Sequence, residues 1–421
     1  MPAPNRPTVL VGARLLDGRS PDATPNGVLV IDEAGRILAA GSEPSTTVPE
    51  DADRIDLTGL TLLPGIIDCH VHLAMKLEPV HDQVQHSATD IVVRALQTGR
   101  DFLESGVTTV RDAGHAPAGI KRAFASSAFP GPRTQVSCQP LSQTGGHGDD
   151  WTPSGAIIDS SFATEMSDLP SGIADGPDAV RRAARQQIRA GADWIKVMAT
   201  GGVLSAADNP DASQFTEEEI RAIVEEARAA GIKGTLAHAE GTAGIKNALR
   251  AGITSIEHGD LIDEEGIDLM LARDVPLVPT FTVNFALMDE GRIARGEVPP
   301  WAIEKMRYLF ERQQSNFRHA VDRGVRVVMG TDSFNGMYPP AELAYMSEYG
   351  LGPFRAIQAA TSEAAKLLGL SDVVGTLEPG KLADLIAVSG DPLAEPELWR
   401  VPARIVFVMQ GGRVVADRRG A

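Results

Sequence analysis

Hydrophobic and polar positions alternate in short runs at both ends of the chain. Residues 8–63 contain the β-rich runs VLVGARLL, GVLVIDE, GRILAAG and DRIDLTG, which Gly, Asp and Pro residues separate. The C-terminus has the same character in DLIAVSG and RIVFVMQGGRVVAD, where the pair Gly411-Gly412 between apolar runs predicts a hairpin. We therefore expect residues 1–63 and 367–421 to build one small β-sandwich domain together.

The middle of the chain, residues 64–366, alternates strand candidates with amphipathic helices. The eight strand candidates are GIIDCHVH, GVTTVRDAG, RTQVSCQ, ADWIKVMA, GTLAHAE, ITSIEHG, VPLVPTF and VRVVMGTD. In FTEEEIRAIVEEARAAG, Thr216 and Glu219 form a capping box that begins a helix. Eight βα units in one run predict an α/β fold, a (β/α)8 TIM barrel. The alternative is an open doubly wound sheet, which we disfavour because polar residues end most of the strands, as if they surrounded one site.

Composition narrows the class of partner. The 421 residues carry a formal net charge of -17, which disfavours nucleic acid and anionic membranes as partners. Two cysteines do not make a disulfide framework. We see no signal peptide and no apolar run near the ~18 residues that a membrane span needs, so we expect a cytoplasmic protein that acts on a small molecule.

Polar side chains with metal-binding chemistry occur on several of the predicted strands. His70 and His72 follow the apolar run of the first strand, and side-chain alternation places both imidazoles on one face. The same alternation directs Cys69 to the opposite face. We interpret Cys69 as a small buried hydrophobic residue rather than a ligand or a nucleophile. In the fourth strand, alternation directs Ile195 and Val197 toward the helices and Lys196 into the barrel interior, where a buried cation is costly. Strands five, six and eight end at His238, His258 and Asp332.

Other polar residues have simpler interpretations. Arg111 and Asp112, at the end of the second strand, are predicted to form a structural ion pair. We also predict a structural role for His115, which follows them. The remaining histidines outside the strands and the TGGHG loop are predicted to lie on the surface: His81, His86 and His319. Two long connections, 139–178 and 282–322, are expected to shape a substrate pocket.

The motifs PGIIDCHVH and GTLEPGKLADLIAV resemble those of the metal-dependent amidohydrolase superfamily, and the resemblance covers nearly the whole sequence. It implies that Lys196 is carbamylated by CO2 and bridges two divalent metal ions. Zinc is the default metal, although manganese, cobalt or nickel suits the same donors. The ligands that the resemblance implies are His70, His72, Lys196, His238, His258 and Asp332.

The run MATGGVLS and the GGHG loop are most similar to the prolidase-like group, which includes the ochratoxin-hydrolysing amidohydrolases. This resemblance implies an amide hydrolase that releases a C-terminal amino acid from a dipeptide or an N-acyl amino acid. A hydroxide between the metals is the implied nucleophile, Asp332 the general acid and base, and His147 the group that contacts the substrate carbonyl. It also implies a homo-oligomer, as large as an octamer.

The sequence leaves two alternatives open. The first is a cyclic-amide hydrolase of the imidazolonepropionase type, which shares much of the ligand set. Deamination is disfavoured, because deaminases of this superfamily generally lack the carbamylated lysine. The second alternative is a scaffold protein that has lost catalysis, which the complete set of six ligand positions disfavours.

Overall fold

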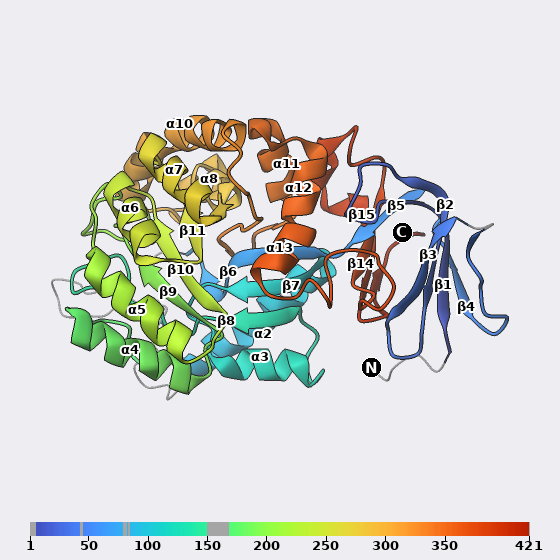
Figure 1. Cartoon of the computed structure of the whole chain (residues 1–421), viewed down its shortest axis with the longest axis horizontal. Helices are drawn as coiled ribbons and strands as arrows, with labels where there is room; N and C mark the ends of the chain where they lie inside the picture. The colour runs from blue at the N-terminus through green and yellow to red at the C-terminus, as the bar shows by residue number, and fades with distance from the viewer. Residues whose placement is uncertain (1–5, 43–44, 79–81, 83–84, 150–167, 421) are drawn as a thin grey trace.

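The computed structural model describes residues 6–42, 45–78, 82, 85–149 and 168–420 (Figure 1). It contains one sheet that joins the two ends of the chain and a larger body of parallel strands and helices. No helix in the described part of the chain is long and apolar enough to cross a membrane.

The terminal sheet has eight strands in the order β16-β15-β14-β5-β1-β2-β3, with β4 paired to β1. Its strands are β1 (Thr8–Leu15), β2 (Thr24–Ile31), β3 (Ile37–Ser42), β4 (Asp53–Asp56), β5 (Leu60–Pro64), β14 (Leu385–Ser389), β15 (Ile405–Gln410) and β16 (Arg413–Asp417). The antiparallel pair β5–β14 joins the N-terminal and C-terminal strands. The hairpin predicted at Gly411-Gly412 is confirmed, because Gln410 pairs with Arg413 across it. The β-sandwich itself and the domain boundaries remain predictions.

The larger body contains two four-stranded parallel sheets, in the orders β13-β6-β7-β8 and β12-β11-β10-β9. Their strands are β6 (Ile66–Lys76), β7 (Val107–Asp112), β8 (Arg133–Val136), β9 (Trp194–Met198), β10 (Gly234–Ala239), β11 (Ser255–His258), β12 (Leu277–Val278) and β13 (Ser333–Asn335). Alternation of parallel strands with covering helices fits a TIM-barrel-type enzyme.

Helices follow most of these strands and cover the sheets, as Figure 1 shows. They are α2 (Ala88–Glu104), α3 (Ala118–Ala125), α4 (Pro177–Ala190), α5 (Glu217–Ala229), α6 (Thr242–Ala251), α7 (Glu264–Arg273), α8 (Phe281–Leu287), α9 (Glu290–Ala294), α10 (Pro300–Asp322), α11 (Ala341–Met346), α12 (Pro353–Ala359) and α13 (Ser362–Leu367). The capping box of Thr216 and Glu219 is confirmed at the start of α5. The long connection 282–322 is largely helical, since it contains most of α8 and all of α9 and α10.

The eighth predicted strand, residues 325–332, is not a regular strand. Its backbone still lies between β12 and β6: the Val328 amide donates to the Leu277 carbonyl (3.0 Å), and the Cys69 amide donates to the Met329 carbonyl (2.9 Å). The segment then turns sharply, because Asp332 has a left-handed backbone (φ 52°). The assigned strand begins only after this turn, at Ser333.

Cys69 does not point away from the histidine face, so that prediction is wrong. It packs with Trp194 and Leu236, which precede Lys196 and His238 by two residues and share their face. The pairing of β6 with β7 shifts register between Asp68 and Val71, which interrupts the simple alternation. Cys69 is fully buried, as the sequence predicted, and burial raises the pKa of its thiol.

Gly35 provides a test of the junction between the two ends of the chain. It has φ +79°, and a Cβ atom there would lie 2.1 Å from the Gly411 carbonyl oxygen. Its own carbonyl accepts a hydrogen bond from the Ala383 amide at 2.8 Å. Gly35→Ala should therefore lower the free energy of unfolding in two ways. An alanine in the left-handed backbone conformation costs ~1–2 kcal/mol, and the clash of its Cβ atom with Gly411 costs a further ~1–3 kcal/mol.

The matched control is Gly59→Ala, because Gly59 has φ +83° but no atom within 4 Å of an added Cβ. It should lose only the backbone contribution. Urea denaturation of both variants measures the difference, and equal losses would show that the Gly35–Gly411 contact does not constrain the sheet.

Candidate active site

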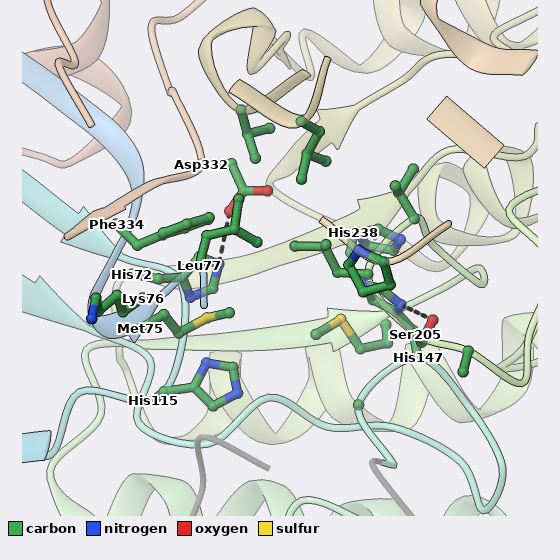
Figure 2. Close-up of a pocket in the computed structure, with 18 of the residues that line it drawn as sticks. His72, Met75, Lys76, Leu77, His115, His147, Ser205, His238, Asp332 and Phe334 are labelled. Carbon is green, nitrogen blue, oxygen red and sulfur yellow. Dashed lines mark hydrogen bonds and ion pairs between the residues drawn. The ribbon is translucent and has the colours of Figure 1, made fainter. Parts of the chain in front are cut away.

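One cavity of about 280 Å³ lies at the carboxyl ends of β9, β10 and β11 and beside β6. Catalytic groups of TIM-barrel-type enzymes lie at this end of the strands. All the predicted site residues line the cavity: His70, His72, His147, Lys196, His238, His258 and Asp332. Figure 2 shows His72 and Asp332 on one side of it, with His147 and His238 on the other.

His70, His72 and Asp332 form a compact group, with their ligand atoms all within 4.8 Å of one another. The Asp332 Oδ1 atom lies 3.1 Å from Nε2 of His72 and 3.6 Å from Nε2 of His70. Burial raises the pKa of Asp332, but His70, His72 and Lys196 together outweigh burial and the net shift is downward. The group therefore offers two imidazole nitrogens and a carboxylate at one point, which suits a divalent metal ion.

A buried ionic network fixes the orientation of the His70 ring. Nδ1 of His70 lies 2.8 Å from Oε2 of Glu257, and Nη2 of Arg111 donates to Oε1 of the same carboxylate at 2.8 Å. The Ser255 hydroxyl donates to that oxygen as well, at 2.5 Å. Both Arg111 and Glu257 are fully buried. With Nδ1 engaged by a carboxylate, Nε2 of His70 is the atom directed into the site, as for histidines that bind metals.

Arg111 thus pairs with Glu257, and the predicted ion pair with Asp112 is wrong. Asp112 instead accepts hydrogen bonds from the backbone amides of Leu73 (2.8 Å) and Gly114 (3.0 Å). Sequence reasoning missed Glu257, although it immediately precedes His258 in SIEHG. Glu257 contacts His70, and the next residue, His258, still lines the cavity, because His258 has a left-handed backbone (φ 70°) that breaks the alternation.

Lys196, His238 and His258 form the second half of the site. The Lys196 amine lies 3.4 Å from Nε2 of His70, and it forms no ion pair among the described residues. Burial is the largest influence on this amine and lowers its pKa to about 8. The His258 ring lies 4.6 Å from the His238 ring and 5.2 Å from the His70 ring, measured between centroids. The two halves are therefore contiguous.

Hydrogen bonds also fix the two histidines of this second half. Nδ1 of His258 lies 2.7 Å from the Thr280 hydroxyl, and Nε2 of His238 lies 2.9 Å from the Gly201 carbonyl. Burial lowers the pKa of His238 and of His258 well below the ordinary value. Neutral imidazole is the form that binds metals.

His147 approaches the site from the loop after β8. Its ring stacks on His238 with centroids 4.2 Å apart, and its Nδ1 lies 2.7 Å from the Ser205 hydroxyl (Figure 2). Ser205 in turn donates to Asp208, and Lys305 donates to the same carboxylate oxygen at 2.9 Å. Sequence reasoning missed these three supporting residues. Of the three, only Ser205 belongs to a motif that the sequence analysis singled out, since it ends the MATGGVLS run.

Polar groups around the rim complete the cavity. Glu78, which is 6 % exposed, accepts from Lys76 (2.8 Å) and His86 (2.7 Å). His86 lines the cavity and is half-buried, so its predicted surface position is wrong. His319 is exposed as predicted, and His81 lies outside the described residues. His115 lines the cavity as well, with its ring 5.5 Å from that of His72.

Fold and site together define an α/β enzyme with a cluster of histidine, carboxylate and lysine side chains, of types that can bind metal, in a cavity at the carboxyl ends of parallel strands. The model of the Amidohydrolase family matches residues 61–415, and the chain belongs to this family. It is a hydrolase that acts on amide bonds, in the prolidase and ochratoxinase group.

Three relatives support this placement. Ochratoxinase of Aspergillus niger is 35% identical over 367 residues, which cover 84% of this chain and 75% of that protein. A prolidase complexed with N-methylphosphonate-L-proline matches with a TM-score of 0.89 at 32% identity, covering 98% of this chain and 100% of the other. A Xaa-Pro dipeptidase with bound methionine matches with a TM-score of 0.86 at 32% identity, covering 97% of this chain and 99% of the other.

Glu257→Gln should destabilise the protein strongly, because it leaves the Arg111 charge buried without a full counter-charge. Removing one partner of a buried pair costs about 3–5 kcal/mol. The control is Glu225→Gln, since Glu225 is exposed and pairs with Arg181 on the surface. That change should cost less than about 1 kcal/mol. Urea denaturation measures both, and a small loss for Glu257→Gln would mean that the network does not support the fold.

Proposed function

We propose that the protein is a binuclear metal-dependent amide hydrolase that releases a C-terminal amino acid. The observation that carries this proposal is the single cavity lined by all six candidate metal ligands together with His147. The two sheets would be halves of one closed (β/α)8 barrel, which residues 64–366 form. Residues 1–63 and 367–421 would form the second domain.

The donor set fits a pair of divalent cations. His70, His72 and Asp332 would hold one cation, and His238 and His258 the other. Lys196 would bridge them as a carbamate. The carbamate needs a neutral amine, and burial of Lys196 favours that form, since it outweighs the opposing charges of Glu257 and Asp332. When bound, the cations, zinc by default, would lower the pKa of a water molecule and polarise the scissile carbonyl.

Two side chains would then do the chemistry around the substrate. Asp332 would take a proton from the attacking water at a carboxylate oxygen and deliver it to the departing amine. His147 would donate from its imidazole to the carbonyl oxygen as negative charge develops there. The Ser205 hydroxyl donates to Asp208, so it accepts from Nδ1 of His147 and fixes the orientation of that imidazole. Donation from Nε2 then needs a ring that carries both protons, which Asp208 would stabilise, since its carboxylate lies 3.4 Å from Nδ1.

The apolar part of the cavity supports an amino-acid side chain such as proline or phenylalanine as the released residue. Its lining includes Met75, Leu77, Val283, Leu287, Trp301 and Phe334. The names of the relatives point the same way, toward an Xaa-Pro dipeptide or an ochratoxin-type amide. A cyclic amide is the alternative substrate, although none of the described residues that line the cavity favours a ring over an open chain.

The direct test combines metal content per chain with a hydrolysis screen of dipeptides and N-acyl amino acids that end in proline or phenylalanine. Two metal ions per chain and release of a free amino acid are expected. Two metal ions with hydrolysis of cyclic amides alone would replace the proposed substrate class. Absence of metal in an active preparation would overturn the mechanism.

Lys196→Ala should remove the bridging ligand, so metal content should fall and most activity should be lost. Added short-chain carboxylates should restore part of the activity, since a small carboxylate can occupy the position of the carbamate. The control is Lys246→Ala, because Lys246 lies on α6 and pairs with Asp263 at the surface. Normal activity of Lys196→Ala would refute the bridging role.

Asp332→Asn should retain most of the metal, because five of the six ligands remain. Turnover should fall by about 10²–10⁴-fold, as expected when a general base is lost. Metal analysis and steady-state kinetics of the same preparation separate the two effects, with the exposed Asp268→Asn as control. Turnover near that of the unaltered enzyme would exclude Asp332 as the proton carrier.

A further inference from the structure

Glu240 is a buried acid in the cavity to which the proposed mechanism gives no role. It follows β10 directly, two residues after His238, and it is 4 % exposed. It lines the same cavity as the candidate metal ligands. Burying a carboxylate is costly unless hydrogen bonds or a positive charge compensate it, so its partners decide what it does.

The carboxyl group of Glu240 has almost no compensation among the described residues. No donor reaches its Oε2 atom, and its Oε1 atom lies 3.9 Å from Nε2 of His238. That nitrogen is already 2.9 Å from the Gly201 carbonyl. The neighbouring acid Asp260 is 2 % exposed, and its Oδ1 atom also lacks a donor. Two buried acids thus adjoin each other beside the site.

No lysine or arginine among the described residues forms an ion pair with Glu240, and Lys305, whose charge acts on it from a distance, contacts other groups. The Lys305 amine donates to Asp208 and to the carbonyls of Gly202 and Ser205 at 2.6–2.9 Å. The residues outside the described part of the chain contain no lysine or arginine. A second buried acid of the cavity, Glu78, shows the contrast, because Lys76, His86 and Arg94 all contact it.

The position of Glu240 matches one group of a dipeptide. In a dipeptide the α-ammonium nitrogen is two bonds from the scissile carbonyl carbon, so it must lie next to the groups that attack that carbon. Glu240 lies there, beside His238. In an N-acyl amino acid this position holds an uncharged carbon, which cannot compensate a buried carboxylate.

We propose that Glu240 is a specificity-determining residue that binds the free α-ammonium group of the substrate, which makes dipeptides the preferred substrates over N-acyl amino acids. This inference rests on the proposed function, because it assigns the group that lies beside the scissile amide. The ammonium supplies the charge and the hydrogen-bond donors that Glu240 lacks in the free protein. The neighbouring acid Asp260 disfavours negative charge on Glu240 in the free protein, and a bound ammonium group would offset that repulsion.

The test compares two substrates that differ only in the amino group: alanyl-phenylalanine and propionyl-phenylalanine, with the corresponding proline pair. The quantity measured is the ratio of kcat/KM for the alanyl over the propionyl compound. The unaltered enzyme should prefer the alanyl compound, and Glu240→Gln should lower the ratio by about 10–100-fold, the value of a charge-assisted hydrogen bond in a buried site.

Glu78→Gln is the matched control, because it neutralises another buried acid of the same cavity and should leave the ratio unchanged. Metal content is measured for every variant. Equal losses for both substrates, loss of metal from Glu240→Gln, or a preference of the unaltered enzyme for the propionyl compound would each overturn the inference.

Calorimetric binding of the same compounds separates this inference from the proposed function. If the unaltered protein hydrolyses neither compound, the proposed function fails, yet the ratio of the two dissociation constants still tests Glu240. Tighter binding of the alanyl compound that Glu240→Gln abolishes supports the inference. Equal binding of both compounds by the unaltered protein contradicts it.

Discussion

The buried Glu257 carboxylate is the interaction on which the rest of the site depends. It accepts from Arg111 on β7 and Ser255 on β11, and it lies 2.8 Å from Nδ1 of His70 on β6. Three strands from both four-stranded sheets are thereby tied together at one carboxylate. A buried ion pair contributes little net stability, because desolvation offsets the attraction. Its effect here is to fix the direction of His70 and the relative position of the sheets.

Backbone strain lies at the same end of the strands. His258, Thr280 and Asp332 all have positive φ, between 52° and 70°, and each such L-residue costs roughly 1–2 kcal/mol. Hydrogen bonds offset the strain: His258 contacts the Thr280 hydroxyl, and the Asp332 amide donates to the His70 carbonyl at 2.7 Å. Residues that a regular strand would direct elsewhere can thus reach one cavity.

Local periodicity predicted the α/β class and the polar strand ends that line the cavity, whereas His147 and the assignment of the ligands depended on the resemblance to the amidohydrolases. Strand alternation placed Lys196 correctly, since β9 is regular over that residue. Predictions failed where the backbone is irregular: at Cys69, where the register shifts, and over 325–332, where the chain turns before Ser333. The partner of Arg111 was missed for a different reason, because Glu257 is 146 residues away in sequence.

Burial also sets the charge of the site before any substrate arrives. His70, His238 and His258 are held neutral because burial lowers their pKa values, and burial favours the neutral amine of Lys196. Neutral nitrogens lose little on burial and bind cations readily. The proposed cations would therefore meet few negative ligands, Asp332 and the carbamate, and would keep a net positive charge. Such a centre repels an ammonium group, so a dipeptide needs a separate acid nearby, and Glu240 provides one.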